Sequence, residues 1–131
     1  MISAAIVTFN EAKKLKDCLF SIKDLADEIV IIDLGSTDNL DEVLKKFKQV
    51  KKVVHERVLY VEPVRQFSIE QCKGDWVLVL DPDERVSSGL GKKLRRFLRI
   101  HYLRLMQLIF QQKIYSLAGR LHIQIFGLIV I

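Results

Sequence analysis

Short apolar runs alternate with stretches of mixed apolar and charged residues along the first two thirds of the chain. The strongest runs cover residues 4–7, 29–32 and 76–80, and each is continuous rather than alternating. Strands that are buried on both faces of a parallel sheet have this pattern, because neither face meets water. We therefore predict three buried strands, with a weaker strand around residues 53–55.

Apolar residues at helical spacing separate these runs. Pro63 suits the first turn of a third helix, Gly74 suits the position after its end, and a further helix is predicted from about Ser88. Strands that alternate with helices predict an α/β fold with right-handed connections and a mostly parallel sheet. The first two helices each carry one apolar stripe: Leu15, Cys18, Leu19 and Ile22, then Leu40, Val43, Leu44 and Phe47.

Polar residues follow each of the three buried runs. Thr8 to Glu11 follow the first, Asp33 to Asp38 follow the second, and Asp81 to Glu84 follow the third. Ligands of α/β sheets bind at the carboxyl ends of the strands, so these segments are expected to meet at one ligand-binding edge. The structural alternative is helix capping, by Thr8 or Asn10 for the first helix and by Asp38 for the second.

The segment Asp81-Pro82-Asp83-Glu84 places three acids directly after a buried strand. Pro82 stiffens the turn, because its ring fixes its own φ and restricts the residue before it. Two carboxylates held close together repel each other unless a cation lies between them, and Mg²⁺ is commonly held by one or two carboxylates plus substrate phosphates. We interpret Asp81 and Asp83 as metal ligands; the alternative is a solvated turn in which Asp83 or Glu84 pairs with Arg85.

Charge is distributed unevenly over the 131 residues, whose net charge is +5. Residues 1–84 carry 12 Lys and Arg and all 16 Asp and Glu, a net charge of −4, whereas residues 85–131 carry 9 Lys and Arg and no acid, a net charge of +9. A basic segment favours an anionic partner, and we consider a membrane surface. No recognisable RNA-binding pattern interleaves aromatic residues with these charges, so nucleic acid is not expected.

Two cysteines, Cys18 and Cys72, lie far apart in helix-like stretches. They are interpreted as reduced core thiols rather than as a disulfide framework, and no secretory signal is recognised at the amino terminus. We therefore expect a cytoplasmic protein, peripheral at the inner face of the cell membrane if the basic segment contacts lipid.

The stretches SAAIVTFNEAKKLKDCL, ADEIVIIDLGSTDNLDEV and KGDWVLVLDPDERVS, in this order and spacing, resemble the amino-terminal half of a family 2 glycosyltransferase. The resemblance covers residues 3 to about 98 and implies a Rossmann-like GT-A fold. It implies transfer of a sugar, metal-assisted and inverting, from a nucleotide-diphosphate sugar that is UDP-linked. The acceptor would be a cell-surface glycan, such as lipopolysaccharide, or a lipid-linked molecule of bacteria.

The resemblance also assigns roles to individual residues. Asp33 matches the acid that hydrogen-bonds the base, and Thr8 lies where the nucleoside is contacted. Arg65 matches a basic residue near the base and diphosphate, although it could equally be an ordinary surface arginine. The implied site comprises nucleotide-sugar-binding residues and a pair that holds Mg²⁺ or Mn²⁺: Thr8, Asn10, Glu11, Asp33, Arg65 and Asp81, with Asp81 and Asp83 as the metal ligands.

The chain departs from the family after the acidic turn. An inverting transferase needs a general base for the acceptor hydroxyl, but no acid follows Glu84, and His101 and His122 are interpreted as bystanders. We divide the chain into a nucleotide-sugar-binding domain, residues 1–99, and an atypical basic and apolar tail, residues 100–131. The tail is interpreted either as a truncated or frameshifted product or as a membrane-interfacial segment.

Two other functions are weighed against the transferase. One is a catalytically incomplete fragment that binds nucleotide-sugar and transfers nothing. The other is a phosphatase of the haloacid dehalogenase kind, which also places D-x-D after a strand; that motif continues with a small residue and Thr, whereas Glu84 and Arg85 follow here. A dinucleotide oxidoreductase is disfavoured because no G-x-G-x-x-G follows a strand.

Overall fold

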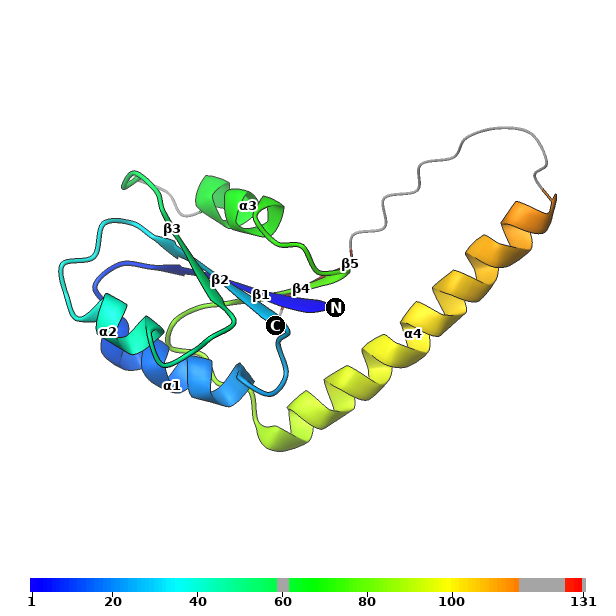
Figure 1. The fold of residues 1–131 in the computed structure, drawn as a ribbon, viewed down its shortest axis with the longest axis horizontal. Coiled ribbons are helices and arrows are strands. Elements are labelled where there is room, and N and C mark those ends of the chain that lie inside the picture. The colour runs from blue at the N-terminus through cyan, green and yellow to red at the C-terminus, as the bar shows by residue number, and fades with distance from the viewer. Residues whose placement is uncertain (59–61, 116–126, 131) are drawn as a thin grey trace.

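A computed structural model describes residues 1–58, 62–115 and 127–130, with side chains described as far as residue 103 (Figure 1). Strands and helices alternate along the chain, as the sequence predicts. The elements are β1 (Ile2–Thr8), α1 (Ala12–Ile22), β2 (Glu28–Asp33), α2 (Leu40–Leu44), β3 (Val50–Val54), α3 (Glu62–Glu70), β4 (Trp76–Leu80), α4 (Ser88–Tyr115) and β5 (Gly127–Val130).

The strands form one sheet in the order β3-β2-β1-β4-β5, and every neighbouring pair is parallel. The predicted parallel α/β fold is confirmed. The register pairs Thr8 with Asp33 and Ile6 with Leu80, so β1, β2 and β4 end at the same edge. β5 was not predicted from the sequence, and β3 begins a few residues before the predicted strand.

Both faces of the central strands are covered. Figure 1 shows α1 and α2 on one face of the sheet and α3 on the other. Along β2, Ile29 and Ile31 pack into the cluster beneath α1, whereas Val30 and Ile32 pack with Val64 of α3. This alternation explains why the strands read as continuous apolar runs.

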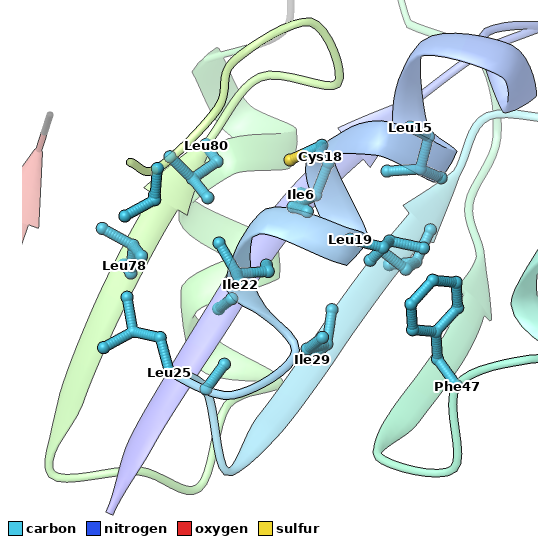
Figure 2. Packing of buried hydrophobic residues seen from close by; sticks show 14 of the residues in the cluster. Ile6, Leu15, Cys18, Leu19, Ile22, Leu25, Ile29, Phe47, Leu78 and Leu80 are labelled. Atoms are coloured by element: carbon cyan, nitrogen blue, oxygen red, sulfur yellow. The ribbon is translucent and has the colours of Figure 1, made fainter. Parts of the chain in front are cut away.

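The apolar stripe of α1 forms the centre of the larger core. Leu15, Leu19 and Ile22 are fully buried and belong to one cluster with Ile6 of β1 and Leu78 of β4 (Figure 2). Burying a large aliphatic side chain contributes about 1.5–3 kcal/mol relative to leaving it exposed. This stripe therefore fixes α1, and with it the loop from β1 to α1, against the sheet.

α2 is shorter than its apolar stripe predicts, whereas α4 begins at Ser88 as expected. α2 ends at Leu44, so Phe47 lies in the following turn, where its ring packs edge-to-face on Phe20 with centroids 5.1 Å apart. The chain must turn here because β3 begins at Val50. α4 runs unbroken past residue 99, and its first turns pack on the α1 side of the core through Leu94 and Leu98. Among the described helices, none is both long and apolar enough to span a bilayer.

Cys18 and Cys72 are both free thiols, as predicted. Cys18 lies in α1 and is fully buried, whereas Cys72 follows α3 and is half-buried. Burial raises the pKa of each thiol to about 11, because a thiolate loses its hydration in an apolar surrounding. Both side chains therefore serve as neutral packing groups at neutral pH.

A close approach at the amino edge of the sheet ties β1 to β2 and β4. The hydroxyl of Ser3 donates to Glu28 at 2.6 Å and accepts from the backbone N–H of Gly74 at 2.8 Å. A Cβ at Gly74 would lie 2.6 Å from Ser3 Oγ and 2.9 Å from the carbonyl oxygen of Met1. Only glycine fits at position 74 without displacing the strand beside it.

Substituting Gly74→Ala is therefore expected to destabilise the fold by about 1–3 kcal/mol, the usual cost of overpacking. The measurement is the free energy of unfolding from urea titration followed by circular dichroism. Gly89→Ala is the matched control, because a Cβ there meets nothing within 4 Å and alanine favours the helix. Equal stability of the two variants would contradict the close packing at Gly74.

Candidate functional site

The carboxyl edge of the sheet brings Thr8 and Asp33 side by side. They are register partners at the ends of β1 and β2, and each is almost fully buried. Asp33 accepts a hydrogen bond from the backbone N–H of Ser36 at 2.8 Å. Thr8 Oγ1 has no hydrogen-bond partner within the described part of the chain. A buried hydroxyl without a partner costs free energy, so this atom is suited to meet a ligand.

Lys52 of β3 supplies a positive charge beside Asp33, which sequence reasoning missed. Its ammonium lies 3.5 Å from the Asp33 carboxylate and 2.5 Å from that of Asp41. The hydrogen bond to Asp41 is the main cause that raises the pKa of Lys52, so the lysine stays charged. The sequence alone does not reveal this contact, because the proximity of Lys52 to the buried acid depends on the register between β2 and β3.

Four hydrogen bonds join the loop after β1 to the loop after β2. The N–H of Asn10 donates to Ser36 Oγ at 2.9 Å, and Asn10 Oδ1 accepts from the N–H of Thr37 at 2.7 Å and from its hydroxyl at 3.4 Å. The carboxylate of Asp38 accepts from the N–H of Ala12 at 2.8 Å, in the first turn of α1. We call Asn10, Ser36, Thr37 and Asp38 the loop clamp.

The loop clamp corrects the capping alternatives. Asp38 caps α1 across the loops and not its own helix, because α2 has Asn39 at its N-cap with no side-chain bond. Neither Thr8 nor Asn10 caps α1, whose N-cap residue, Glu11, also makes no side-chain cap bond. Asn10 has a φ of 53°, a left-handed conformation that asparagine tolerates better than most residues, and Gly35 has a φ of 84° as its turn requires.

Glu11 and Phe9 flank this edge. Glu11 binds the ammonium of Lys14 at 2.9 Å, and this contact is the main cause that raises the pKa of Lys14, with a smaller contribution from Asp83. The guanidinium of Arg57, in the segment after β3, lies 4.2 Å from the centroid of the Phe9 ring. Sequence reasoning missed Arg57, because no pattern links an arginine after an edge strand to an aromatic ring after the central one.

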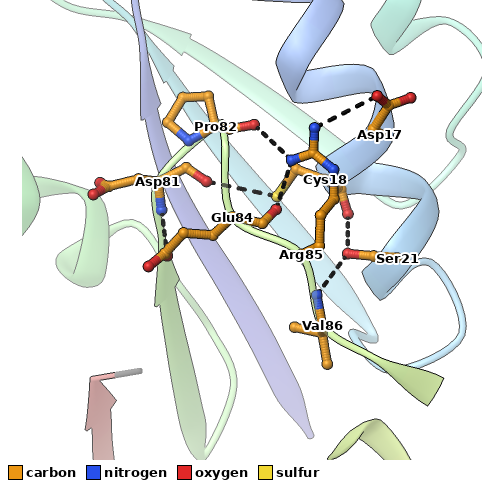
Figure 3. Close-up of polar contacts among 8 residues, drawn as sticks. All are labelled: Asp17, Cys18, Ser21, Asp81, Pro82, Glu84, Arg85 and Val86. Atoms are coloured by element: carbon orange, nitrogen blue, oxygen red, sulfur yellow. Dashed lines mark hydrogen bonds and ion pairs between the residues drawn. The ribbon is translucent and has the colours of Figure 1, made fainter.

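The acidic turn is held from both sides. The N–H of Asp81 donates to Glu84 at 2.9 Å, and the carbonyl oxygen of Asp81 faces the thiol of Cys18 at 3.8 Å. Figure 3 shows the Asp81 carboxylate pointing away from Cys18. On that side Arg65 of α3 donates to Asp81 Oδ1 at 2.7 Å. The structure thus joins Arg65 and Asp81, two residues that the resemblance placed near the diphosphate.

The alternative considered for the acidic turn, a pairing of Arg85 with the carboxylate of Asp83 or Glu84, is wrong. The guanidinium of Arg85 donates to the carbonyl oxygens of Pro82 at 3.2 Å and Glu84 at 2.8 Å, and it lies 3.5 Å from the carboxylate of Asp17 in α1 (Figure 3). The turn directs these two backbone carbonyl oxygens toward the Arg85 side chain. Asp83 stays exposed and makes no ion pair within the described residues.

The donor chemistry of this turn fits a hard divalent cation held jointly with phosphates. Asp81 and Asp83 offer carboxylate oxygens, and the side chain of Asp81 is about half exposed. Among the described residues, no group of three or more His, Cys, Asp and Glu side chains could hold a metal. A protein that supplies only two carboxylates leaves the remaining positions to water and substrate oxygens, as Mg²⁺ sites often do.

The structure describes only one of the two histidines that were considered as general bases. His101 lies on α4 with its ring centroid 3.9 Å from that of Phe97, and its Nδ1 is buried without a partner among the described residues. The interpretation of His101 as a bystander stays a prediction. His122 lies outside the described residues.

The fold is a Rossmann-like α/β domain of the GT-A type, with acids at the carboxyl edge of its sheet. The profile of the family described as "Glycosyl transferase family 2" matches residues 3–110. The chain belongs to this family of glycosyltransferases. The match extends past residue 99, while the proposed division of the chain at that point stays a prediction.

Individual relatives agree with the family. An "Uncharacterized glycosyltransferase" of Rickettsia bellii is 37% identical over 93 residues, which cover 71% of this chain and 31% of the relative. The "Lipopolysaccharide core biosynthesis glycosyltransferase LpsC" of Rhizobium meliloti is 35% identical over 103 residues, 74% of this chain and 37% of that protein. The chain therefore spans about a third of the length of these relatives.

A solved structure shares the fold. The crystal structure of S. aureus TarS, residues 1–349, superimposes with a TM-score of 0.65 at 22% sequence identity. The likeness covers 77% of this chain and 33% of the TarS chain. It extends the agreement from sequence to the arrangement of strands and helices.

The loop clamp yields a stability prediction. Asn10→Ala is expected to lower the free energy of unfolding by about 2 kcal/mol, because it removes a hydrogen-bond acceptor and forces alanine into a left-handed conformation. Asn10→Gly, which accepts that φ, is expected to cost about half as much. Urea titration measures both. Asn39→Ala is the matched control, and losses no larger than in this control would show that Asn10 does not hold the loops.

Proposed function

We propose that the carboxyl edge of this sheet binds the donor of a glycosyl transfer, a nucleotide-diphosphate sugar that is UDP-linked. The observation that carries the proposal is the gathering of Thr8, Asp33 and the Arg65–Asp81 pair at one edge. Family membership supports it, since these are the residues that the resemblance assigned to the nucleotide. Thr8 Oγ1 and Asp33 would meet the nucleoside, and Arg65 the diphosphate.

The residues of the acidic turn would complete the donor site. Asp81 and Asp83 would hold Mg²⁺ or Mn²⁺ together with the diphosphate. The cation, when bound, stabilises negative charge on the departing diphosphate. Asn10 and Glu11, also expected to bind the nucleotide-sugar, have other partners in Thr37 and Lys14. For Asn10 we therefore propose support of the site through the loop clamp, and for Glu11 a place at its rim.

We assign to the described residues the donor half of the reaction. An inverting transfer needs a base for the acceptor hydroxyl, and no acid follows Glu84 in this sequence. The acceptor that we propose is a cell-surface glycan or a lipid-linked molecule, and the name of the LpsC relative supports this class. A fragment that binds the donor and transfers nothing is the alternative, while the phosphatase loses support because the family differs.

Calorimetric titration of UDP in the presence of Mn²⁺ tests the donor site. We expect metal-dependent binding that EDTA removes and that Asp81→Asn/Asp83→Asn weakens at least about tenfold, since each carboxylate contributes a charged contact. Asp24→Asn, an exposed acid after α1 at the opposite edge, is the matched control. Repeats with GDP and dTDP identify the base. Wild-type protein that is folded and binds none of these nucleotides would refute the proposal.

We also propose that α4 brings the protein to an anionic lipid surface. Phe97, Ile100 and Leu103 are exposed on this helix. Residues 88–103 carry five Lys and Arg and no acid, which complements acidic headgroups. This contact would place the donor site beside a membrane-bound acceptor.

Co-sedimentation with phosphatidylserine-containing vesicles measures the contact. Arg96→Gln/Arg99→Gln is expected to weaken binding by about tenfold or more, because each cation near an acidic surface contributes about 1 kcal/mol. Lys45→Gln/Lys46→Gln, after α2, is the charge-matched control. Equal binding to purely zwitterionic vesicles would contradict an electrostatic contact, and self-association without lipid would assign the exposed side chains to a second copy instead.

A further inference from the structure

The Arg65–Asp81 ion pair involves one of the two carboxylates that we propose as metal ligands. Arg65 Nη2 is 2.7 Å from Asp81 Oδ1, and both side chains are partly exposed, at 41% and 51%. Exposed ion pairs contribute little to stability, about 0–1 kcal/mol. The pair is therefore weak enough to exchange partners.

The backbones of the two residues are fixed although their side chains are exposed. The carbonyl oxygen of Arg65 accepts from the hydroxyl of Ser68 at 2.6 Å, and the neighbouring Val64 is buried against the sheet. Asp81 is held by its own N–H, which donates to Glu84, and by its carbonyl oxygen, which faces Cys18. A guanidinium on a fixed backbone can swing between nearby anions without moving the fold.

We propose that Arg65 is a displaceable counter-ion that occupies the cation's position at Asp81 until a nucleotide diphosphate arrives. This inference rests on the proposed donor site. A guanidinium binds phosphate oxygens in two-point fashion, so an arriving diphosphate competes with Asp81 for Arg65. The carboxylate that Arg65 leaves becomes available to a divalent cation, which meets the diphosphate at the same place.

The consequence is that nucleotide and metal bind together. While Arg65 stays on Asp81, a divalent cation must displace a positive charge and then lie beside it, which disfavours metal binding without nucleotide. Once the diphosphate has taken the guanidinium, the two cationic groups are separated by anionic oxygens. Because such coupling is reciprocal, the metal must strengthen nucleotide binding by the same factor.

Arg85 does not share this role, although it lies closer in sequence to the acids. Its guanidinium contacts two backbone carbonyls and Asp17, which makes it part of the turn's framework (Figure 3). Arg65 contacts only the carboxylate of Asp81 with its side chain in the described structure. The distinction identifies Arg65 as the arginine that can leave.

Mn²⁺ binding in the absence of nucleotide tests the inference, with the signal of free Mn²⁺ followed by electron paramagnetic resonance. Arg65→Gln is expected to bind Mn²⁺ alone about two- to fivefold more tightly than wild type, the change that corresponds to an exposed ion pair. The same variant should bind UDP more weakly in EDTA. UDP should then increase its Mn²⁺ affinity by a smaller factor than in wild type.

Two further variants make the result specific. Arg65→Lys keeps the positive charge and should retain nearly wild-type Mn²⁺ binding without nucleotide. Lys46→Gln removes one exposed cation after α2 and should leave Mn²⁺ binding unchanged, which excludes an effect of net charge. Circular dichroism verifies that each variant is folded.

The outcomes separate this inference from the proposed function. Unchanged Mn²⁺ affinity in Arg65→Gln, in a protein whose UDP binding depends on Asp81 and Asp83, would overturn the role of Arg65 and leave the donor site standing. Absence of UDP and Mn²⁺ binding in folded wild type would overturn both. Tighter Mn²⁺ binding in Arg65→Gln together with weaker metal-free UDP binding supports the exchange.

Discussion

Burial of both faces of the parallel strands is the constraint on which the rest of this structure depends. β1, β2 and β4 are covered by helices on either side, so nearly every side chain within them must be apolar. Polar chemistry can begin only where the strands end, and their common register places those ends together. The position of the candidate site therefore follows from the burial of the strands.

The two edges of the sheet differ in how completely their polar groups are satisfied. At the amino edge, the Ser3 hydroxyl bonds to both Glu28 and Gly74, and the packing at Gly74 has no space for a Cβ. At the carboxyl edge the loop clamp holds the backbone, but Thr8 Oγ1 has no partner in the described structure. Rigid support beneath an incompletely satisfied surface is the arrangement expected of a binding site.

The sequence predicts the order of elements, the parallel sheet and the strand ends, because burial on two faces leaves a pattern that local reading detects. It does not predict correctly which residues contact the polar groups at those strand ends. Asp38 caps α1 rather than α2, and Arg85 contacts carbonyls rather than acids. The contacts of Lys52 with Asp33 and of Arg57 with Phe9 are not predicted at all. Each of these contacts joins segments whose proximity is decided by strand register and loop path, which no local pattern records.

The roles of Arg65 and Arg85 illustrate why geometry decides function here. In sequence, Arg85 adjoins the acids and Arg65 is 16 residues from Asp81. The alternation of side chains along β4 explains the contact that the structure shows. Val77 and Val79 face α3, and Asp81, two residues further on, is directed toward the same helix. Arg65, which lies farther from Asp81 in sequence, therefore makes the only side-chain contact to the Asp81 carboxylate within the described residues. Because the backbones of Arg65 and Asp81 are held by the fold, the exchange that we propose would change the partners of these two side chains and leave their backbones in place.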